Sequence, residues 1–218
     1  MSEINIENNT ASVTTRLGAG KLVPVIVLDR AEDASPLAES LIEGGLPVAE
    51  ITMRTPAALD AMKAMANHPE VLLGAGTVCT ADQVDQAVDS GAKYIICPGL
   101  HEEVVERCLE LNVLVIPGVI TPTDIAKAMS YGLDLVKFFP AESFGGAKTL
   151  KAMAAPYGNM RFVPTGGINL QNVTSYLEIS SVTACGGSWM VDRGLIKAGK
   201  FSEITTLVRD AVALAQSI

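Results

Sequence analysis

The sequence predicts an α/β protein, and within that class a (β/α)8 or TIM barrel, because short apolar runs alternate with helical patterns along the whole chain. Near-continuous apolar strands are typical of a parallel sheet that helices cover. Eight such units most economically close into a barrel, whereas an open doubly wound sheet usually has fewer strands. The expected strands span residues 22–28, 47–52, 71–77, 94–99, 113–118, 133–139, 161–166 and 182–187.

The segments between these strands show helical spacing, with Ser, Thr or Asp near their starts and Gly near several of their ends. Thr55-Pro56 and Thr121-Pro122 predict helix N-caps that are followed by a proline in the first turn. Residues 1–20 are expected to form a helix that caps the bottom of the barrel. No linker divides the chain, so we expect a single barrel domain over residues 1–218.

Composition excludes several classes of partner. The net charge of −8 disfavours nucleic acid and an anionic membrane surface. No apolar run approaches the roughly 18 residues of a membrane helix, and the polar start lacks the features of a signal peptide. Hydrophobic residues make up 49% of the chain and charged residues 18%. We therefore expect a subunit interface to cover some of the surface.

Cysteine and histidine usage predicts neither a disulfide framework nor a metal. The cysteines are scattered without a C-x-x-C pair, as expected for free thiols in a reducing cytoplasm. His68 and His101 are the only histidines and lie far apart in the sequence, so no histidine-rich metal site is expected. Both are expected at the surface, near helix starts or ends. The cysteines are Cys79, Cys97, Cys108 and Cys185.

The sixth apolar run, in the stretch LDLVKFFP (133–140), contains a lysine where burial disfavours a charge. An ionised ammonium in an apolar site costs several kcal/mol unless it loses its proton or finds a partner. Lys137 is therefore a candidate for chemistry. The alternative is a lysine that reaches outward to solvent or pairs with an acid for stability.

The second apolar run continues into AEITMRT (49–55), in which Glu50, Thr52 and Arg54 share one parity. Alternate side chains of a strand face the same way, so Glu50 and Arg54 are expected on one face. The second and sixth strands lie across an eight-stranded barrel from each other, which lets long side chains of both meet near the axis. The alternative is a structural ion pair between Glu50 and Arg54 inside the barrel.

These residues together suit a 2-oxo acid. Burial and a nearby cation disfavour the ammonium form of Lys137, and a neutral amine forms a Schiff base with a carbonyl. The carboxylate of Glu50 can move protons, and the guanidinium of Arg54 can hold a substrate carboxylate in a bidentate way.

Two glycine pairs predict a phosphate site. PTGGI (164–168) follows the seventh strand and CGGSW (185–189) follows the eighth, which is where barrels of this kind usually bind phosphate. Gly166, Gly167 and Gly187 expose backbone N–H groups, and Ser188 adds a hydroxyl. Either pair alone also suits an ordinary turn. GAGTVC (74–79) lacks the third glycine of a dinucleotide fingerprint.

The motifs EITMRT, GAGTV, PGL, KFFPAE, PTGGI and GGSW occur in this order, and together they resemble the 2-keto-3-deoxy-6-phosphogluconate and 4-hydroxy-2-oxoglutarate aldolases. The resemblance covers about residues 15–215. It implies a Schiff-base aldolase on a (β/α)8 barrel, commonly a homotrimer, that works without a metal or an organic cofactor. The expected location is the cytoplasm.

The resemblance also implies a role for each motif. Lys137 would form the Schiff base, and Glu50 would be the general acid/base, acting through a water. Arg54 and Thr77 would bind the pyruvate carboxylate. The other implied contacts are Phe139 and Pro98 at the reacting carbons, Thr165 at the aldehyde half, and Gly166, Gly167, Gly187 and Ser188 at the phosphate.

The implied reaction is cleavage of 2-keto-3-deoxy-6-phosphogluconate to pyruvate and glyceraldehyde 3-phosphate, and also of 4-hydroxy-2-oxoglutarate to pyruvate and glyoxylate. Cys97, Val163 and Ile120 depart from the family pattern, although none is a proposed catalytic group. The residues alone leave open a phosphosugar isomerase with Glu50 as base, a non-catalytic phosphosugar-binding barrel and a metal-dependent aldolase. They also leave open which 2-oxo acid is preferred.

Overall fold

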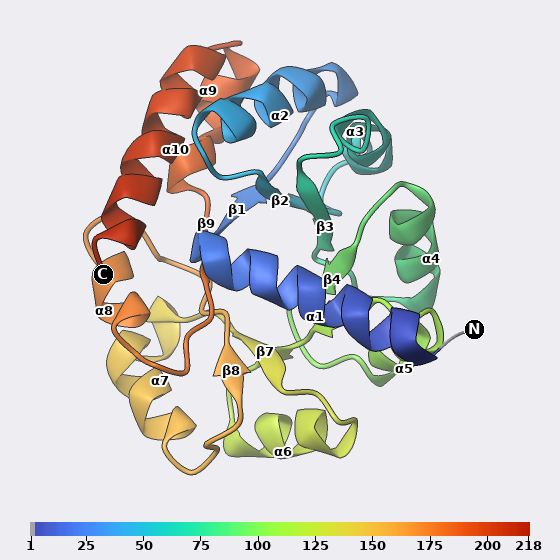
Figure 1. Cartoon of the computed structure of the whole chain (residues 1–218), viewed down its shortest axis with the longest axis vertical. Helices are drawn as coiled ribbons and strands as arrows, with labels where there is room; N and C mark the ends of the chain where they lie inside the picture. Colours follow the sequence, from blue (N-terminus) through green and yellow to red (C-terminus); the bar gives the residue numbers. More distant parts are fainter. Residues whose placement is uncertain (1–2) are drawn as a thin grey trace.

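A ring of parallel strands surrounded by helices forms the protein (Figure 1). The computed structural model describes the backbone of residues 3–218 and the side chains of residues 10–218. The strands lie on the expected apolar runs, and all of their residues are buried except the exposed Arg161 and the half-buried Leu114. The strands are β1 (Leu22–Ile26), β2 (Val48–Thr52), β3 (Leu72–Gly76), β4 (Tyr94–Ile96), β5 (Leu114–Ile116), β6 (Gly118–Val119), β7 (Leu135–Phe138), β8 (Arg161–Phe162) and β9 (Cys185–Gly187).

Strand pairing closes the ring. One sheet has the order β5-β4-β3-β2-β1-β9 and the other has the order β6-β7-β8, and every pair is parallel. Only Pro117 separates β5 from β6, so these two segments occupy one position of the barrel. Parallel bridges from Phe162 to Val182 and from Thr165 to Gly186 join the remaining edges. The predicted (β/α)8 barrel is therefore confirmed.

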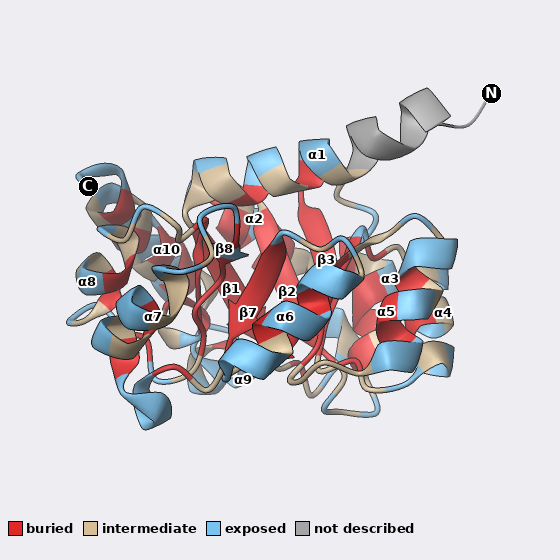
Figure 2. Cartoon of the chain, turned by 90° about the horizontal axis from the view of Figure 1, so that it is seen from below, coloured by how far each residue is buried: buried red, intermediate tan, exposed pale blue. Residues whose placement is uncertain are grey.

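Helices follow most of the strands and cover the outside of the ring. Their buried faces point toward the strands and their exposed faces point outward (Figure 2). The α-helices are α1 (Glu3–Gly20), α2 (Ala34–Glu43), α3 (Ala58–Met65), α4 (Ala81–Asp89), α5 (Glu102–Glu110), α6 (Pro122–Ser130), α7 (Gly146–Ala154), α8 (Val173–Leu177), α9 (Arg193–Lys197) and α10 (Phe201–Gln216). The short 3-10 helices are η1 (Ala31–Asp33), η2 (Glu142–Phe144) and η3 (Trp189–Val191). None of these described helices is long and apolar enough to cross a membrane.

Helix starts agree with the sequence at one threonine-proline pair and differ at the other. Thr121 caps α6 through a full capping box, with Pro122 in the first turn. Thr55 is not a cap: α3 begins only at Ala58, and the Thr55 hydroxyl donates to the carbonyl of Leu28. The expected N-cap at Thr55 is therefore wrong, because the hydroxyl links the end of β2 to the loop after β1.

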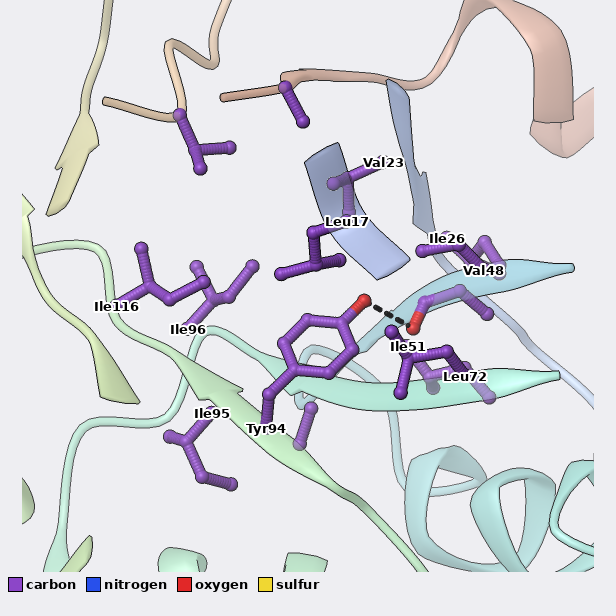
Figure 3. Packing of buried hydrophobic residues seen from close by; sticks show 14 of the residues in the cluster. Leu17, Val23, Ile26, Val48, Ile51, Leu72, Tyr94, Ile95, Ile96 and Ile116 are labelled. Atoms are coloured by element: carbon purple, nitrogen blue, oxygen red, sulfur yellow. Dashed lines mark hydrogen bonds between the residues drawn. The ribbon is translucent and has the colours of Figure 1, made fainter. Parts of the chain in front are cut away.

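The buried cluster fills the inside of the ring and the layer between the strands and the helices, and α1 covers one end of the ring, at the top of Figure 2. Leu17 of α1 belongs to the same buried cluster as Val23 and Tyr94 (Figure 3). The hydroxyl of Tyr94 donates to the carbonyl of Ala49 at 2.9 Å, which satisfies the one polar atom of this ring (Figure 3). The predicted helix at the barrel bottom is therefore present over Glu3–Gly20, while residues 1–2 of that prediction lie outside the described part.

The four cysteines are free thiols, as the spacing predicts, and three of them are buried. His101 immediately precedes α5 and His68 lies shortly after α3, both half-buried, so the expected positions near helix ends are confirmed. Among residues 10–218, no cluster of three or more His, Cys, Asp or Glu side chains has a geometry suited to a metal ion.

Candidate functional site

Lys137 lies in the middle of the barrel wall with its side chain inside the ring. It is the third residue of β7, it pairs with Gly118 of β6, and only 3% of its surface is exposed. Its Nζ lies 4.9 Å from the centre of the Phe139 ring. The alternative of a lysine that reaches solvent is therefore wrong.

Glu50 of β2 meets Lys137 from the opposite side of the ring. Glu50 is 1% exposed, and its Oε1 lies 3.5 Å from Nζ of Lys137. Strands β2 and β7 are half a ring apart, so their side chains reach across the axis to make this contact. The ion pair of Glu50 is with Lys137, so the alternative of a structural pair with Arg54 is not what the barrel contains.

The environment of the Glu50 carboxyl suits proton transfer. Burial raises the pKa of Glu50 above its usual value, while the positive charges of Lys137 and, more weakly, Arg54 oppose this rise. Its Oε2 is buried and has no hydrogen-bond partner among residues 10–218. A buried carboxyl with one oxygen beside an amine and the other oxygen free can take a proton from a ligand and return it.

One glycine makes room for the Glu50 carboxyl, and a second, which pairs with Lys137, lets the backbone at Pro98 approach closely. A Cβ on Gly76 of β3 would lie 2.1 Å from Oε1 of Glu50, and a Cβ on Gly118 would lie 2.2 Å from the carbonyl oxygen of Pro98. Any other residue at Gly76 displaces the Glu50 carboxyl. The sequence interpretation missed both glycines: GAGTV was weighed as a nucleotide fingerprint and as the family motif that contains Thr77, and the side-chain packing that places Gly76 against Glu50 was unknown.

Arg54 and Thr77 lie together at the top of neighbouring strands. β2 ends at Thr52, so Arg54 lies in the turn that follows, and strand alternation does not decide where its side chain points. Its exposed guanidinium donates from Nε to Oγ1 of Thr77 at 3.1 Å. Thr77 has a φ of 60° immediately after β3. A guanidinium and a hydroxyl at the barrel mouth suit a carboxylate.

Thr165 and the glycine pairs lie side by side at the ends of the last two strands. Thr165 is 6% exposed and forms a bridge with Gly186, whose missing Cβ would lie 2.3 Å from Oγ1 of Thr165. Gly166 and Gly167 follow with φ values of 100° and 81°, which only glycine adopts freely.

The remaining candidates lie on the same end of the barrel. Gly187 is buried because the Trp189 ring fills the space that a Cβ would take, and the following Ser188 is exposed. Pro98 follows β4 and Phe139 follows β7, both half-buried. The structure thus gathers these candidates at the carboxyl ends of the strands, where barrels of this fold place their active sites.

Known proteins resemble this chain over nearly its whole length. Residues 13–207 match the aldolase family described as KDPG and KHG aldolase, where KDPG is 2-keto-3-deoxy-6-phosphogluconate and KHG is 4-hydroxy-2-oxoglutarate. A 2-dehydro-3-deoxy-phosphogluconate aldolase of Haemophilus influenzae is 47% identical over 204 residues, which is 93% of this chain and 96% of the relative. A KHG/KDPG aldolase of Escherichia coli K12 is 42% identical over 95% of this chain and 98% of its own.

Solved structures of aldolases from this family superpose closely on the chain. The KDPG aldolase of Zymomonas mobilis with 3-phosphoglycerate superposes with a TM-score of 0.89 at 38% identity, covering 94% of this chain and 97% of that one. The KDPG aldolase of Legionella pneumophila, with pyruvate captured as a covalent carbinolamine intermediate, gives 0.88 at 39% identity, covering 91% and 97%. The chain therefore belongs to the KDPG and KHG aldolase family.

Proposed function

We propose that this chain cleaves 2-keto-3-deoxy-6-phosphogluconate (KDPG) into pyruvate and glyceraldehyde 3-phosphate through a Schiff base on Lys137. As a member of its family it is a class I aldolase, a lyase. One observation supports the residue assignment above all others: a buried amine lies 3.5 Å from a buried carboxyl that has a free oxygen. This arrangement contains both a nucleophile for the keto carbon and a base for the neighbouring hydroxyl.

The reaction begins when Glu50 takes a proton from the ammonium of Lys137, and the freed Nζ attacks the C2 carbonyl carbon and forms a carbinolamine. Glu50 returns this proton to the carbinolamine hydroxyl, and loss of water gives a protonated imine. Glu50 then takes the proton of the C4 hydroxyl, the C3–C4 bond breaks, and its electron pair moves into the imine. Glyceraldehyde 3-phosphate leaves, and an enamine remains on the lysine. Protonation at C3 and hydrolysis release pyruvate and restore the amine.

We assign the binding residues by their position. Arg54 and Thr77 hold the carboxylate of the keto acid, since their side chains already touch at the mouth. Phe139 and Pro98 pack around the reacting carbons, and Thr165 contacts the aldehyde half. The phosphate rests on Gly166, Gly167, Gly187 and Ser188. The relative from Zymomonas mobilis, solved with the phosphorylated acid 3-phosphoglycerate, supports a phosphate subsite.

We propose 4-hydroxy-2-oxoglutarate (KHG) as a second substrate. The Escherichia coli relative is named for both substrates. The phosphate loops contain neutral donors, and a carboxylate can accept from the same N–H groups as a phosphate. KHG would then place its distal carboxylate there and release glyoxylate in place of glyceraldehyde 3-phosphate.

We also propose that residues 1–218 form one cooperative domain that assembles as a homotrimer in the cytoplasm. The apolar composition and the free thiols support this proposal. Sedimentation equilibrium measures the oligomer, and a single transition in urea measures the cooperativity. A monomer contradicts the proposed trimer, and two separate unfolding transitions contradict the proposed single domain.

The decisive experiment traps the imine. We expect borohydride with pyruvate to inactivate the protein and to leave a reduced adduct on the peptide that contains Lys137. Lys137→Ala should lose both adduct and activity, whereas Lys93→Ala, which alters an exposed lysine near the other end of the barrel, should keep both. No adduct on Lys137, or full activity in Lys137→Ala, refutes the assignment.

Two further assays separate the alternatives. A lactate-dehydrogenase-coupled assay detects pyruvate, which neither an isomerase nor a non-catalytic binding barrel releases. Full activity after prolonged EDTA treatment is expected, and loss of activity that a divalent cation restores would favour the metal-dependent aldolase.

A further inference from the structure

The three carbonyl groups of the turn after β8, from Thr165 to Gly167, all accept hydrogen bonds. The carbonyl of Thr165 accepts from the N–H of Ala141 at 2.8 Å, and the carbonyl of Gly166 accepts from the N–H of Glu142 at 3.1 Å. The carbonyl of Gly167 accepts from two side chains, Nδ2 of Asn169 at 3.3 Å and Nδ2 of Asn172 at 3.1 Å.

The N–H groups of the same peptides are left free. A trans peptide holds its C=O and N–H in opposite directions, so anchoring a carbonyl on one side turns the next N–H to the other side. The N–H groups of Gly166, Gly167 and Ile168 donate to no acceptor among residues 10–218. Three successive free N–H groups in a glycine turn form an anion-binding surface.

Orientation matters for this surface because the segment that forms it has no cationic side chain of its own. No Lys or Arg occurs between Arg161 and Arg193. The guanidinium of Arg193 is itself bound to the carboxylate of Asp29 through two hydrogen bonds. An anion on this turn therefore depends on N–H dipoles that must be held in place.

Asn172 is the group that fixes the turn. Its Nδ2 donates to the carbonyl of Gly167, and its Oδ1 accepts from the N–H of Asn169 at 2.8 Å, so one planar amide joins both ends of the turn. An amide side chain offers a donor and an acceptor side by side, whereas an ionised carboxylate only accepts. Without it, Gly167 can rotate, since a glycine has little steric restraint, and can present its carbonyl oxygen to the ligand in place of an N–H.

We propose that Asn172, assisted by Asn169, is a positioning residue that holds the three N–H groups for the phosphate of the substrate. It acts through the backbone of Gly166 and Gly167 and does not touch the ligand. The inference rests on the proposed function, which places the phosphate on this turn. It adds a determinant of phosphate affinity that lies outside the motifs PTGGI and GGSW.

The test compares a phosphorylated ligand with one that has no phosphate. Asn172→Ala and Asn172→Asp are assayed for kcat and KM with KDPG, and for the pyruvate concentration that half-saturates borohydride trapping. We expect KM for KDPG to rise roughly tenfold, which corresponds to the loss of about one hydrogen bond to a charged group. The half-saturating pyruvate concentration and kcat should stay within about twofold of wild type, because pyruvate does not reach the turn.

Asn159→Ala and Asn159→Asp are the matched controls, since Asn159 is an exposed asparagine before β8, at the other end of that strand. They should leave both measurements unchanged. Asn169→Ala removes one of the two donors to Gly167 and should raise KM for KDPG by a smaller factor. It also serves as the test if Asn172→Ala does not fold.

An unchanged KM for KDPG in the Asn172 and Asn169 variants overturns the inference. An equal rise for KDPG and pyruvate also overturns it, because that result indicates general loss of structure. Failure of the proposed function is distinct: wild-type protein would then give no pyruvate adduct on Lys137.

Discussion

Gly76→Ala tests whether the Glu50 carboxyl must stay where the barrel holds it. The substitution adds one methyl group to β3, whereas Lys137 belongs to β7. That methyl would lie 2.1 Å from Oε1, 2.6 Å from Cγ and 2.7 Å from Cδ of Glu50. These separations lie well inside van der Waals contact, so the carboxyl must move.

The size of the effect follows from the displacement. The carboxyl has to retreat by about 1 Å or more, and a misplacement of that size costs roughly 100-fold in rate. We therefore expect kcat to fall about 100-fold, or about 2.7 kcal/mol in the activation barrier. Overpacking is also expected to lower the free energy of unfolding by about 1–3 kcal/mol.

The pyruvate-release assay measures kcat, and urea unfolding shows whether the variant is folded. Gly158→Ala is the control, because a Cβ there meets nothing within 4 Å and the backbone is not in the left-handed region. In a Glu50→Ala background the new methyl has space, so Gly76→Ala should slow the reaction little further. A wild-type kcat in folded Gly76→Ala, or a further 100-fold loss in the Glu50→Ala background, refutes the reasoning.

Activity should rise with pH as Glu50 ionises, and burial raises its pKa, so the acid limb of kcat/KM should have its midpoint above pH 4.5. Residual activity of Glu50→Gln should lack that limb, and a midpoint at or below 4.5 would contradict this cause. Thr121→Ala removes the cap of α6 and should lower the free energy of unfolding by about 1 kcal/mol in urea, whereas Thr121→Ser should not. Lys137→Met combined with Glu50→Leu should abolish activity yet unfold within about 1 kcal/mol of wild type, and a much larger loss would assign the pair a structural role.

The fold was predictable because burial on both faces leaves a strong pattern in every strand. The observed strand ends differ from the predicted ones where a glycine or a proline interrupts the hydrogen bonding between strands. The seventh strand was expected over 161–166, but β8 covers only Arg161–Phe162, since Pro164 has no N–H and Gly166 adopts a φ of 100°. Thr165 therefore pairs with Gly186 of β9 through an isolated bridge and not as part of a continuous strand.

The centre of the site was predictable for a different reason. A lysine in an apolar run is rare enough to indicate chemistry, and the strand count alone placed β7 opposite β2. Strand alternation stopped being informative at Thr52, so it did not place Arg54. Asn172 was missed because its function depends on a backbone carbonyl five residues earlier, although two asparagines after a glycine pair do indicate a structured turn.

The buried pair of Lys137 and Glu50 is poorly explained by a contribution to stability. Burying two charges costs several kcal/mol, and a contact at 3.5 Å with one carboxyl oxygen left without a partner only partly offsets that cost. Apolar side chains at Lys137 and Glu50 would pack a barrel at least as well. Oε2 has no protein partner among residues 10–218, so it can accept a hydrogen bond from a substrate hydroxyl or a water. The pair is therefore better explained by chemistry than by stability.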